Sequence, residues 1–309
     1  MQQSRTGFVR RAKRLVVAAL TPPLRLSHRA RLEARYRRLS ATVRVSPLSL
    51  PAGPLLAVFP HVDDETIAAG GILRAAAASG TEVDLVYTTD SSAGGLGPTP
   101  ADRASRRRGE AERLAASMGL RSVTTLSGVN EHLAEQTEAV TAELAAHVAQ
   151  GHYAAAFVVG PVDAHHEHRT SAAVIAEALQ RAGFTGEVYV GENSTLLPPT
   201  LLTHAHPLSR SALRAKDALF DHFGSQASMD FVVYHDLARA KRWLTPGAHA
   251  AELFCRTDAA GLAALCAAVQ GLDPDRTLPH RIGNTWTLGR ALRMPTPPLR
   301  RPAAAPGQE

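Results

Sequence analysis

The sequence has few cysteines, few aromatic residues and no apolar run long enough to suggest a membrane span near its N-terminus. Its only cysteines, Cys255 and Cys266, exclude a disulfide framework and a zinc site built from paired thiolates. Two isolated cysteines are typical of a reducing compartment, so we expect a cytoplasmic protein in which both thiols pack as small apolar side chains. Aromatic residues form 5% of the chain, so the core must consist mainly of aliphatic side chains.

The overall composition is that of a folded protein. Hydrophobic residues make up 45% of the 309 residues and charged residues 20%. This apolar content is enough to close one sizeable core, and it excludes a chain that is disordered throughout or built on a collagen-like repeat. We therefore expect one large domain or two small ones.

Charge is distributed very unevenly along the chain. Residues 1–44 contain twelve Lys or Arg and a single acid, Glu33, which gives this arm a net charge of +11. The remaining chain holds 22 basic and 27 acidic residues, a net charge of −5. The split indicates an anionic partner for the arm and argues against nucleic-acid binding by the whole protein.

The basic arm has the pattern of a short amphipathic helix. Its longest apolar run, Leu15–Leu20, is too short to span a membrane or to serve as a typical signal-peptide core, and no small-x-small cleavage pattern follows. Apolar residues recur at helical spacing with basic residues between them. Such a helix can lie on an anionic membrane surface, or it can pack on the body with its arginines in solvent. The sequence leaves both readings open.

The chain from Leu55 onward alternates short apolar runs with longer helical patterns. This alternation predicts the α/β class, with a Rossmann-like, doubly wound, mostly parallel sheet covered by helices on both faces. We expect a basic arm and linker over 1–50, one domain over 51–293 and a disordered Pro- and Ala-rich tail over 294–309. The predicted strands are Leu55–Pro60, Val83–Asp90, Val123–Leu126, Ala155–Gly160 and Glu187–Val190, with a late strand near Glu252–Arg256. The predicted helices are Thr66–Ala78, Ala101–Met118, Gln136–Ala149 and His168–Ala182, with a further helix within His204–Phe223.

Two polar clusters follow two of these strands. The run from His61 to Glu65 places a histidine and three acids between the first strand and the first helix. Such charge at the end of a buried strand is costly unless a helix N-terminus or a cation offsets it. The run from Asp163 to His168 follows the fourth strand in the same way, and His165 and His168 share a face if the helix has begun.

The predicted topology brings the two clusters together. In a doubly wound sheet of order 3-2-1-4-5 the first and fourth strands are neighbours, and their carboxyl ends flank the crevice where ligands bind. Nitrogen and oxygen donors arriving there from both sides suit zinc, with three protein ligands and one open position for water. A shared metal site therefore explains both clusters better than two unrelated polar segments.

The motifs resemble those of the PIG-L/LmbE-like family of zinc-dependent N-acetylglucosaminyl deacetylases. The family opens with His-Pro-Asp-Asp-Glu before a glycine-rich helix start, and this chain has His61-Val62-Asp63-Asp64-Glu65 followed by Gly70-Gly71. The later family motif His-Pro-Asp-His corresponds to His165-His166-Glu167-His168, and an Arg107-Arg108-Gly109-Glu110 helix lies between them. The resemblance covers roughly Leu55 to Arg256, and the motifs are specific only in combination.

The resemblance implies a set of metal ligands and a catalytic base. His61, Asp64 and His168 take the ligand positions of the family, and Asp63 takes the position of the general base. The implied cofactor is Zn²⁺, although another divalent metal can occupy such a site.

The resemblance also implies roles for three further residues. His165 would assist the tetrahedral intermediate or the leaving amine, and Glu167 would replace the aspartate that orients this histidine. Arg107 would bind substrate, although a salt bridge on the helix surface fits its pattern almost as well. Two departures from the motifs, Val62 and His166 in place of prolines, bear on the orientation of His165 more than on the metal site.

The implied reaction is the removal of an N-acetyl group from an N-acetylglucosamine-type sugar. Water activated at the metal attacks the acetyl carbonyl with Asp63 as base, and acetate leaves. The expected partners are an N-acetylated sugar or glycoconjugate and, through the arm, the anionic inner face of a membrane. Two alternatives stay open: an amidase acting on another N-acyl or thiol-conjugate substrate, and a non-catalytic, membrane-peripheral binding homologue.

Overall fold

The computed structural model describes residues 2–226, 229–278, 282–293 and 297–300, with side chains from residue 19 onward except at 275–276. Of the predicted tail, 294–309, only 297–300 lie within the described residues. The strands are β1 Ser46–Pro47, β2 Leu55–Phe59, β3 Val83–Thr89, β4 Ser122–Gly128, β5 Ala155–Val159, β6 Glu187–Gly191, β7 His204–Leu208 and β8 Ala250–Thr257. The helices are α1 Gln2–Leu39, α2 Asp64–Ala78, α3 Pro100–Met118, α4 Thr137–Gly151, α5 His166–Arg181, α6 Arg210–Leu219, α7 Val232–Ala240, α8 Ala259–Gln270, α9 Pro274–Thr277 and α10 Thr285–Ala291. Short 3-10 turns are η1 Leu133–Glu135, η2 Pro199–Leu201, η3 Phe220–His222 and η4 Lys241–Leu244.

The described strands form one mixed sheet in the order β1-β7-β8-β6-β5-β2-β3-β4. From β4 through β6 all neighbouring strands are parallel, and β2 pairs with both β3 and β5. This part of the sheet has the predicted order, because β2 and β5 are the first and fourth strands of the predicted series. The α/β doubly wound class is confirmed.

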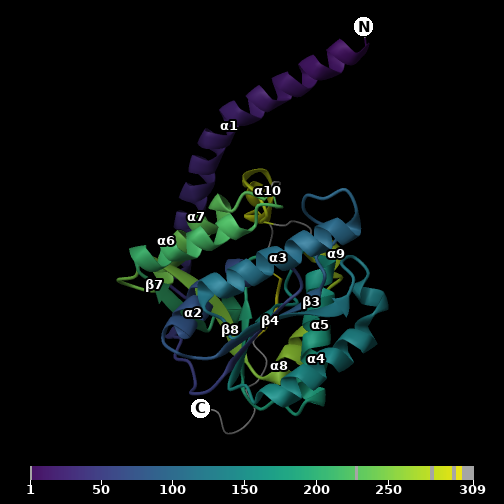
Figure 1. Ribbon diagram of the computed structural model, residues 1–309. Helices are drawn as coiled ribbons and strands as arrows, with labels where there is room; N and C mark the ends of the chain where they lie inside the picture. The colour runs from purple at the N-terminus through teal and green to yellow at the C-terminus, as the bar shows by residue number, and fades with distance from the viewer. Residues whose placement is uncertain (1, 227–228, 279–281, 294–296, 301–309) are drawn as a thin grey trace.

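Helices cover both faces of the sheet (Figure 1). Helices α2 and α3 lie over one face, and α4, α5 and α8 lie over the other. Every residue of β2, β3 and β5 is buried, as expected for strands covered on both sides. The carboxyl ends of β2 and β5 are therefore among the few places where this core meets a polar crevice.

The sheet continues beyond β6 through two antiparallel pairings. Strand β8 pairs antiparallel with both β6 and β7, and it includes the predicted late strand. The prediction missed β7, since its sequence His-Ala-His-Pro-Leu has neither an apolar run nor a simple alternation. Helix α6 lies within the span predicted to hold a helix, directly after β7.

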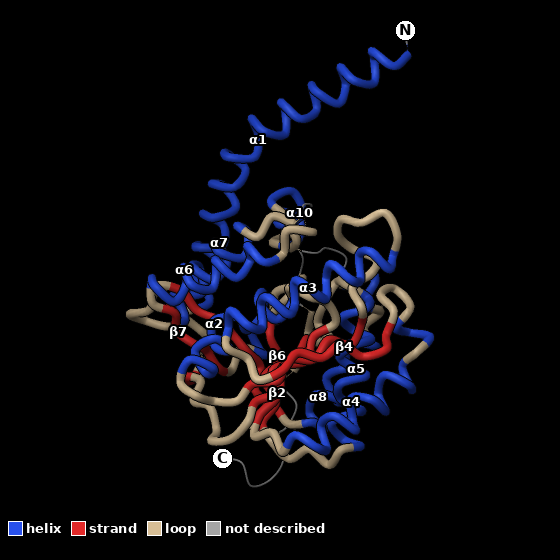
Figure 2. Tube along the Cα trace, viewed as in Figure 1, coloured by secondary structure: helices blue, strands red, loops and turns tan. Residues whose placement is uncertain are grey.

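The basic arm is a single long helix, α1, of which only the second half packs on the body. Leu32 and Tyr36 are buried in the core, and Glu33 accepts hydrogen bonds from Arg242 (2.5 Å) and from Trp243 (2.6 Å) in η4. The first half runs away from the body (Figure 2). The two readings of the arm concerned the amphipathic pattern around Leu15–Leu20, in the first half of the helix, and they stay predictions. The packing of the second half is a separate finding. Among the described residues, no helix is both long and apolar enough to cross a membrane.

Candidate active site

The acidic cluster lies on the tight turn between β2 and α2. Asp63 is the residue before the helix and has φ 115° and ψ −27°, a left-handed conformation that is strained for a residue with a side chain and costs about 1–3 kcal/mol. Its backbone N–H donates to the Glu65 carboxylate at 3.0 Å, while the preceding N–H of Val62 donates to Ser91 Oγ at 3.1 Å. These contacts hold the strained turn, so that Asp63 and Asp64 occupy consecutive positions at the helix start.

Three of the predicted ligands converge on one point. His61 Nδ1 lies 3.1 Å from Asp64 Oδ2, His168 Nε2 lies 3.3 Å from the same oxygen, and the two nitrogens are 3.3 Å apart. Ligands about 2.0–2.1 Å from a tetrahedral metal centre are separated by about 3.3–3.4 Å. The triangle therefore has the dimensions of one face of a zinc coordination shell, and the donor set fits a divalent cation.

The orientation of His61 is fixed from the side opposite the triangle. Its Nε2 lies 2.6 Å from Glu167 Oε2, which leaves Nδ1 free to act as a ligand atom. Glu167 itself accepts from the backbone N–H of Glu131 at 2.6 Å and from the side-chain amide of Asn130. A carboxylate on the second ring nitrogen is the usual partner of a metal-binding histidine.

The role predicted for Glu167 therefore needs correction. We expected its carboxylate to orient His165, but both carboxylate oxygens contact other groups, and only the backbone N–H of Glu167 donates to His165 Nδ1, at 3.3 Å. The additional methylene of glutamate compared with aspartate extends the carboxylate from the start of α5 across to His61. Glu167 is thus positioned to orient a ligand, not the assisting histidine.

Two supporting residues were missed by the sequence analysis. Asp163 Oδ2 lies 3.1 Å from His168 Nδ1, so His168 has a carboxylate partner as His61 does. Asn193 donates from Nδ2 to Asp64 Oδ1 at 3.2 Å. Asp163 stands in the second cluster and its acidity was a usable signal, whereas Asn193 follows β6 without any motif.

The pKa shifts reflect this concentration of charge. Burial alone would raise the pKa of Asp64, but His168 and His61 together hold it far below its usual range. Burial would lower the pKa of His168, yet Asp64 and Asp163 raise it to about 10. Because a ligating imidazole is neutral, a bound cation would displace this proton, and binding is expected to strengthen as pH rises.

Asp63 is the buried carboxylate next to the triangle, and it lines the same pocket. Burial raises its pKa to about 8, while Arg107 opposes the increase. A carboxylate with its pKa near neutrality has the affinity for protons that a general base requires. The geometry is consistent with the predicted role of Asp63, which stays a prediction.

The predicted contact of Arg107 with substrate does not agree with its burial. Arg107 is completely buried and donates to Asp63 at 3.1 Å, to Glu110 at 2.8 Å and to Ser225 Oγ at 3.4 Å. The alternative reading as a surface salt bridge is equally wrong, because α3 turns this side chain toward the core. Arg107 instead supports Asp63 from beneath the pocket.

His165 lies on the wall of the pocket beside the triangle of His61, Asp64 and His168. It is the residue before α5, and its ring stacks on His168 with centroids 4.7 Å apart and planes 6° from parallel. The three histidines His61, His165 and His168 each offer a nitrogen within 4.8 Å of the others and could hold a metal. The set with Asp64 in place of His165 is tighter, and it leaves His165 available for the substrate.

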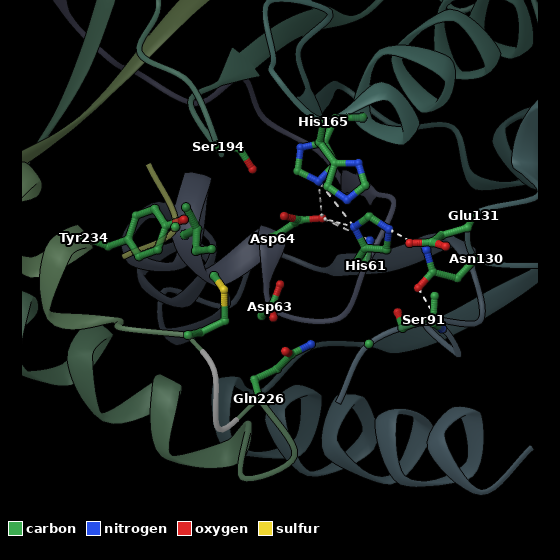
Figure 3. A pocket seen from close by; sticks show the side chains of 16 residues that line it. His61, Asp63, Asp64, Ser91, Asn130, Glu131, His165, Ser194, Gln226 and Tyr234 are labelled. Carbon is green, nitrogen blue, oxygen red and sulfur yellow. Dashed lines mark hydrogen bonds and ion pairs between the residues drawn. The ribbon is translucent and has the colours of Figure 1, made fainter. Parts of the chain in front are cut away.

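The opposite wall includes Gln226, which with Lys216 and Ser225 also matches the family's pattern, and residues such as Tyr234 that no motif indicated. Figure 3 shows Gln226 and Tyr234 across the pocket from His61 and His165. The cavity has a volume of about 260 Å³. Besides His61, Asp63, Asp64, His165 and His168, it is lined by Ile67, Ser91, Ala93, Gly94, Asn130, Glu131, Ser194, Gln226, Met229, Tyr234 and Gly283. One wall is thus rich in charged and metal-binding groups, while the other mixes amide, thioether and aromatic side chains.

Comparison with known families agrees with the motifs. Residues 56–179 match the model of the PIG-L family, described as GlcNAc-PI de-N-acetylase. Over these residues the chain is similar to the PIG-L family. The matched region includes both polar clusters and ends within α5, so Gln226 and Tyr234 lie beyond it. No curated protein sequence matches the chain.

Solved structures of similar fold include deacetylases and one enzyme with a different reaction. The N,N'-diacetylchitobiose deacetylase from Pyrococcus horikoshii is 18% identical, with a TM-score of 0.54, over 67% of this chain and 84% of that one. The A40926 pseudoaglycone deacetylase is 16% identical, with a TM-score of 0.54, over 67% and 98%. The 4-carboxy-2-hydroxymuconate hydratase from Pseudomonas putida is 17% identical, with a TM-score of 0.51, over 66% and 95%. These similarities establish the fold and leave the reaction to be argued from the site.

Proposed function

We propose that the protein is a metal-dependent N-deacetylase of an N-acetylated sugar or glycoconjugate, with zinc as the metal. The observation that supports this most is the triangle of His61, Asp64 and His168 beside the carboxylate of Asp63. A hydratase also needs to activate water, but the PIG-L family match favours amide hydrolysis. We place this activity in the cytoplasm, at the inner face of the membrane.

The chemistry follows from the positions of the side chains. A divalent cation held by the triangle would supply Lewis acidity for the acyl oxygen and would lower the pKa of water. Asp63 takes a proton from the attacking water, and Arg107 holds its carboxylate in place. His165, on the other side of the triangle, stabilises the tetrahedral oxyanion of the substrate and assists departure of the amine.

The substrate class rests on the names of related proteins and on the pocket. The family is described by its action on GlcNAc-PI, and two structures of similar fold are named as deacetylases of diacetylchitobiose and of a pseudoaglycone. The wall formed by Gln226 and Tyr234 offers an amide and an aromatic ring, which suit the hydroxyls and the apolar face of a sugar. We infer an N-acetylglucosamine-type substrate with its aglycone outside the pocket.

The test is acetate release from a panel of N-acetylglucosaminides by the purified protein and its Asp63→Asn variant. We expect the activity of the variant to be at least about 100-fold lower than that of the wild type, because removal of a general base typically has an effect of this size. The metal content measured by mass spectrometry should stay unchanged. Asp221→Asn is the matched control, because Asp221 is exposed on η3. Full activity in Asp63→Asn would remove Asp63 from the role of base.

The same panel separates the two alternatives. Thiol-conjugate amides and other N-acyl amines belong in it, and cleavage of these without acetate release would indicate an amidase of different specificity. Binding of metal and sugar with no turnover of any amide by the wild-type protein would indicate a non-catalytic homologue.

A further inference from the structure

The first half of α1 is strongly basic and stands apart from the body. Residues 1–21 contain five Lys or Arg and no acid, and the helix runs outward from the rest of the molecule (Figures 1 and 2). Pro22 and Pro23 lie inside the helix, where they remove backbone hydrogen bonds and favour a bend. The projecting half of the helix therefore carries five basic residues and no acid, while the chain after residue 44 is mildly acidic.

Where α1 approaches the body, it exposes apolar side chains. Leu20 is 49% exposed and Leu26 is 69% exposed, and Val232 at the start of α7 is 43% exposed. Leu26 and Val232 line a shared groove between α1 and α7, together with two arginines, Arg25 and Arg29, and one acid, Asp236. Large aliphatic side chains bordered by arginines are the composition of a surface that inserts shallowly into lipid.

This surface is joined directly to the wall of the active site. Arg25 of α1 donates to Asp230 at 3.0 Å, and Thr285 donates to the same carboxylate at 2.6 Å. Asp230 lies between Met229 and α7, and both Met229 and Tyr234 line the catalytic pocket. The same short segment therefore borders the apolar groove on one side and the pocket on the other.

We propose that α1 and the start of α7 form a docking surface for an anionic phospholipid bilayer, which places the pocket next to the lipid surface. Charge complementarity selects this occupant. A second copy of the chain offers only a body of −5 or another arm of +11, whereas an anionic bilayer is negative over its whole surface. A nucleic acid would make no use of Leu20 and Leu26. The docked enzyme would act on an amphiphile presented by the membrane, and this part of the proposal rests on the proposed function. The docking itself is independent of that function.

The test is cosedimentation of the full-length protein with phosphatidylcholine vesicles that contain or lack phosphatidylglycerol. We expect binding only to the anionic vesicles, with an affinity that falls as salt is raised. Reversing four charges, Arg10→Glu, Arg11→Glu, Lys13→Glu and Arg14→Glu, should weaken binding at least about 100-fold, since each basic residue near the surface contributes roughly fivefold. The matched control is Arg106→Glu with Arg108→Glu, because both side chains are exposed on α3.

A second variant tests insertion separately from charge. Leu20→Asp with Leu26→Asp should weaken binding at least about tenfold, because leucines that enter the lipid lose apolar burial. Both side chains are exposed, so the variant should unfold at the same temperature as the wild type. Wild-type affinity for anionic vesicles in either variant overturns the proposal.

The same protein preparations distinguish the lipid bilayer from other partners of this surface and separate docking from catalytic activity. Tight binding to duplex DNA without binding to vesicles would indicate a nucleic-acid partner and overturn the proposal. Dimerisation in sedimentation velocity that the leucine variant abolishes would indicate a second copy of the chain and overturn it as well. Turnover of a soluble N-acetylglucosaminide should be equal in the wild type and both variants. Vesicle binding by a protein that releases no acetate would refute the proposed function and leave the docking surface standing.

Discussion

The guanidinium of Arg107 lies 3.1 Å from the carboxylate of Asp63, in the completely buried layer beneath the pocket. Arg107 also binds Glu110 at 2.8 Å, so one cation balances two acids. Removal of this cation would leave two buried carboxylates without a countercharge. The ion pair between Arg107 and Asp63 therefore stabilises the fold and also positions the predicted base.

Arg107→Met should destabilise the protein by about 3–5 kcal/mol, because breaking a buried ion pair leaves its partners uncompensated. Urea denaturation measures this loss. Arg106→Met and Arg108→Met are matched controls on the same helix, and their exposed positions predict changes within about 0.5 kcal/mol. Equal stability of all three variants would contradict the buried ion-pair account.

Glu167→Gln should weaken metal affinity about 10–100-fold, since it removes the carboxylate that holds Nε2 of His61. Competition with a chromophoric chelator gives the affinity directly. Glu177→Gln on the same helix is the control, because Glu177 is exposed and pairs with Arg181. If Glu167 acted on His165 instead, activity would fall while the metal affinity of the variant matched that of the wild type.

Lys216→Met should destabilise the protein by about 3–5 kcal/mol. Lys216 donates to Glu252 at 2.6 Å and to the carbonyl of Ile67 at 2.9 Å, and Glu252 accepts from the backbone N–H groups of Gly71 and Ile72. The buried pair thus anchors the middle of α2. Thermal unfolding monitored by circular dichroism tests this, with Arg214→Met, exposed on α6, as the control.

Gly71→Ala tests the same anchor from the helix side. A Cβ at this position would lie 2.7 Å from Leu208 and 3.0 Å from both carboxylate oxygens of Glu252. We expect a loss of about 1–3 kcal/mol from the forced displacement, although alanine is ordinarily the better helix former. Gly109→Ala within α3 meets only an arginine tip at 3.3 Å and should be neutral or stabilising in the same unfolding experiment.

Asp84 gives the fold a defined dependence on acid. Burial raises its pKa, but hydrogen bonds from Arg121, Tyr153 and Ser122 outweigh burial and lower it to about 2. A carboxyl with a lowered folded-state pKa stabilises the fold above its unfolded pKa, near 4, and loses that contribution as pH falls through 2. The difference in unfolding free energy between wild type and Asp84→Asn should be about 1 kcal/mol or more at pH 6 and should shrink between pH 4 and pH 2. A difference that is constant with pH would contradict this.

The position of the site could be predicted because it depends on topology alone. His61 and His168 belong to segments about a hundred residues apart, and the alternation of strands and helices was sufficient to place both at the carboxyl ends of neighbouring strands. The roles of Glu167 and Arg107 could not be predicted in the same way. They depend on side-chain reach and on burial, which a helical pattern does not reveal.

The fold was predictable where strands are buried on both faces and read as continuous apolar runs. Beyond β6 this signal fades. Strand β7 contains two histidines and Pro207, and it is a strand because β8 offers it an antiparallel partner. Helix α8 is apolar almost throughout, so it lacks the polar face that would have identified it from the sequence. Its position in the fold is set by packing against α5.

The anchor of α2 has a consequence for how this protein can be divided. Lys216 and Glu252 both lie outside the segment 56–179 that matches the family model, yet they tie down the helix that begins with Asp64. An excised fragment limited to that segment would keep every proposed ligand and still lack the buried pair that holds the middle of α2. The active-site helix therefore depends on side chains that the chain supplies well after the matched segment ends.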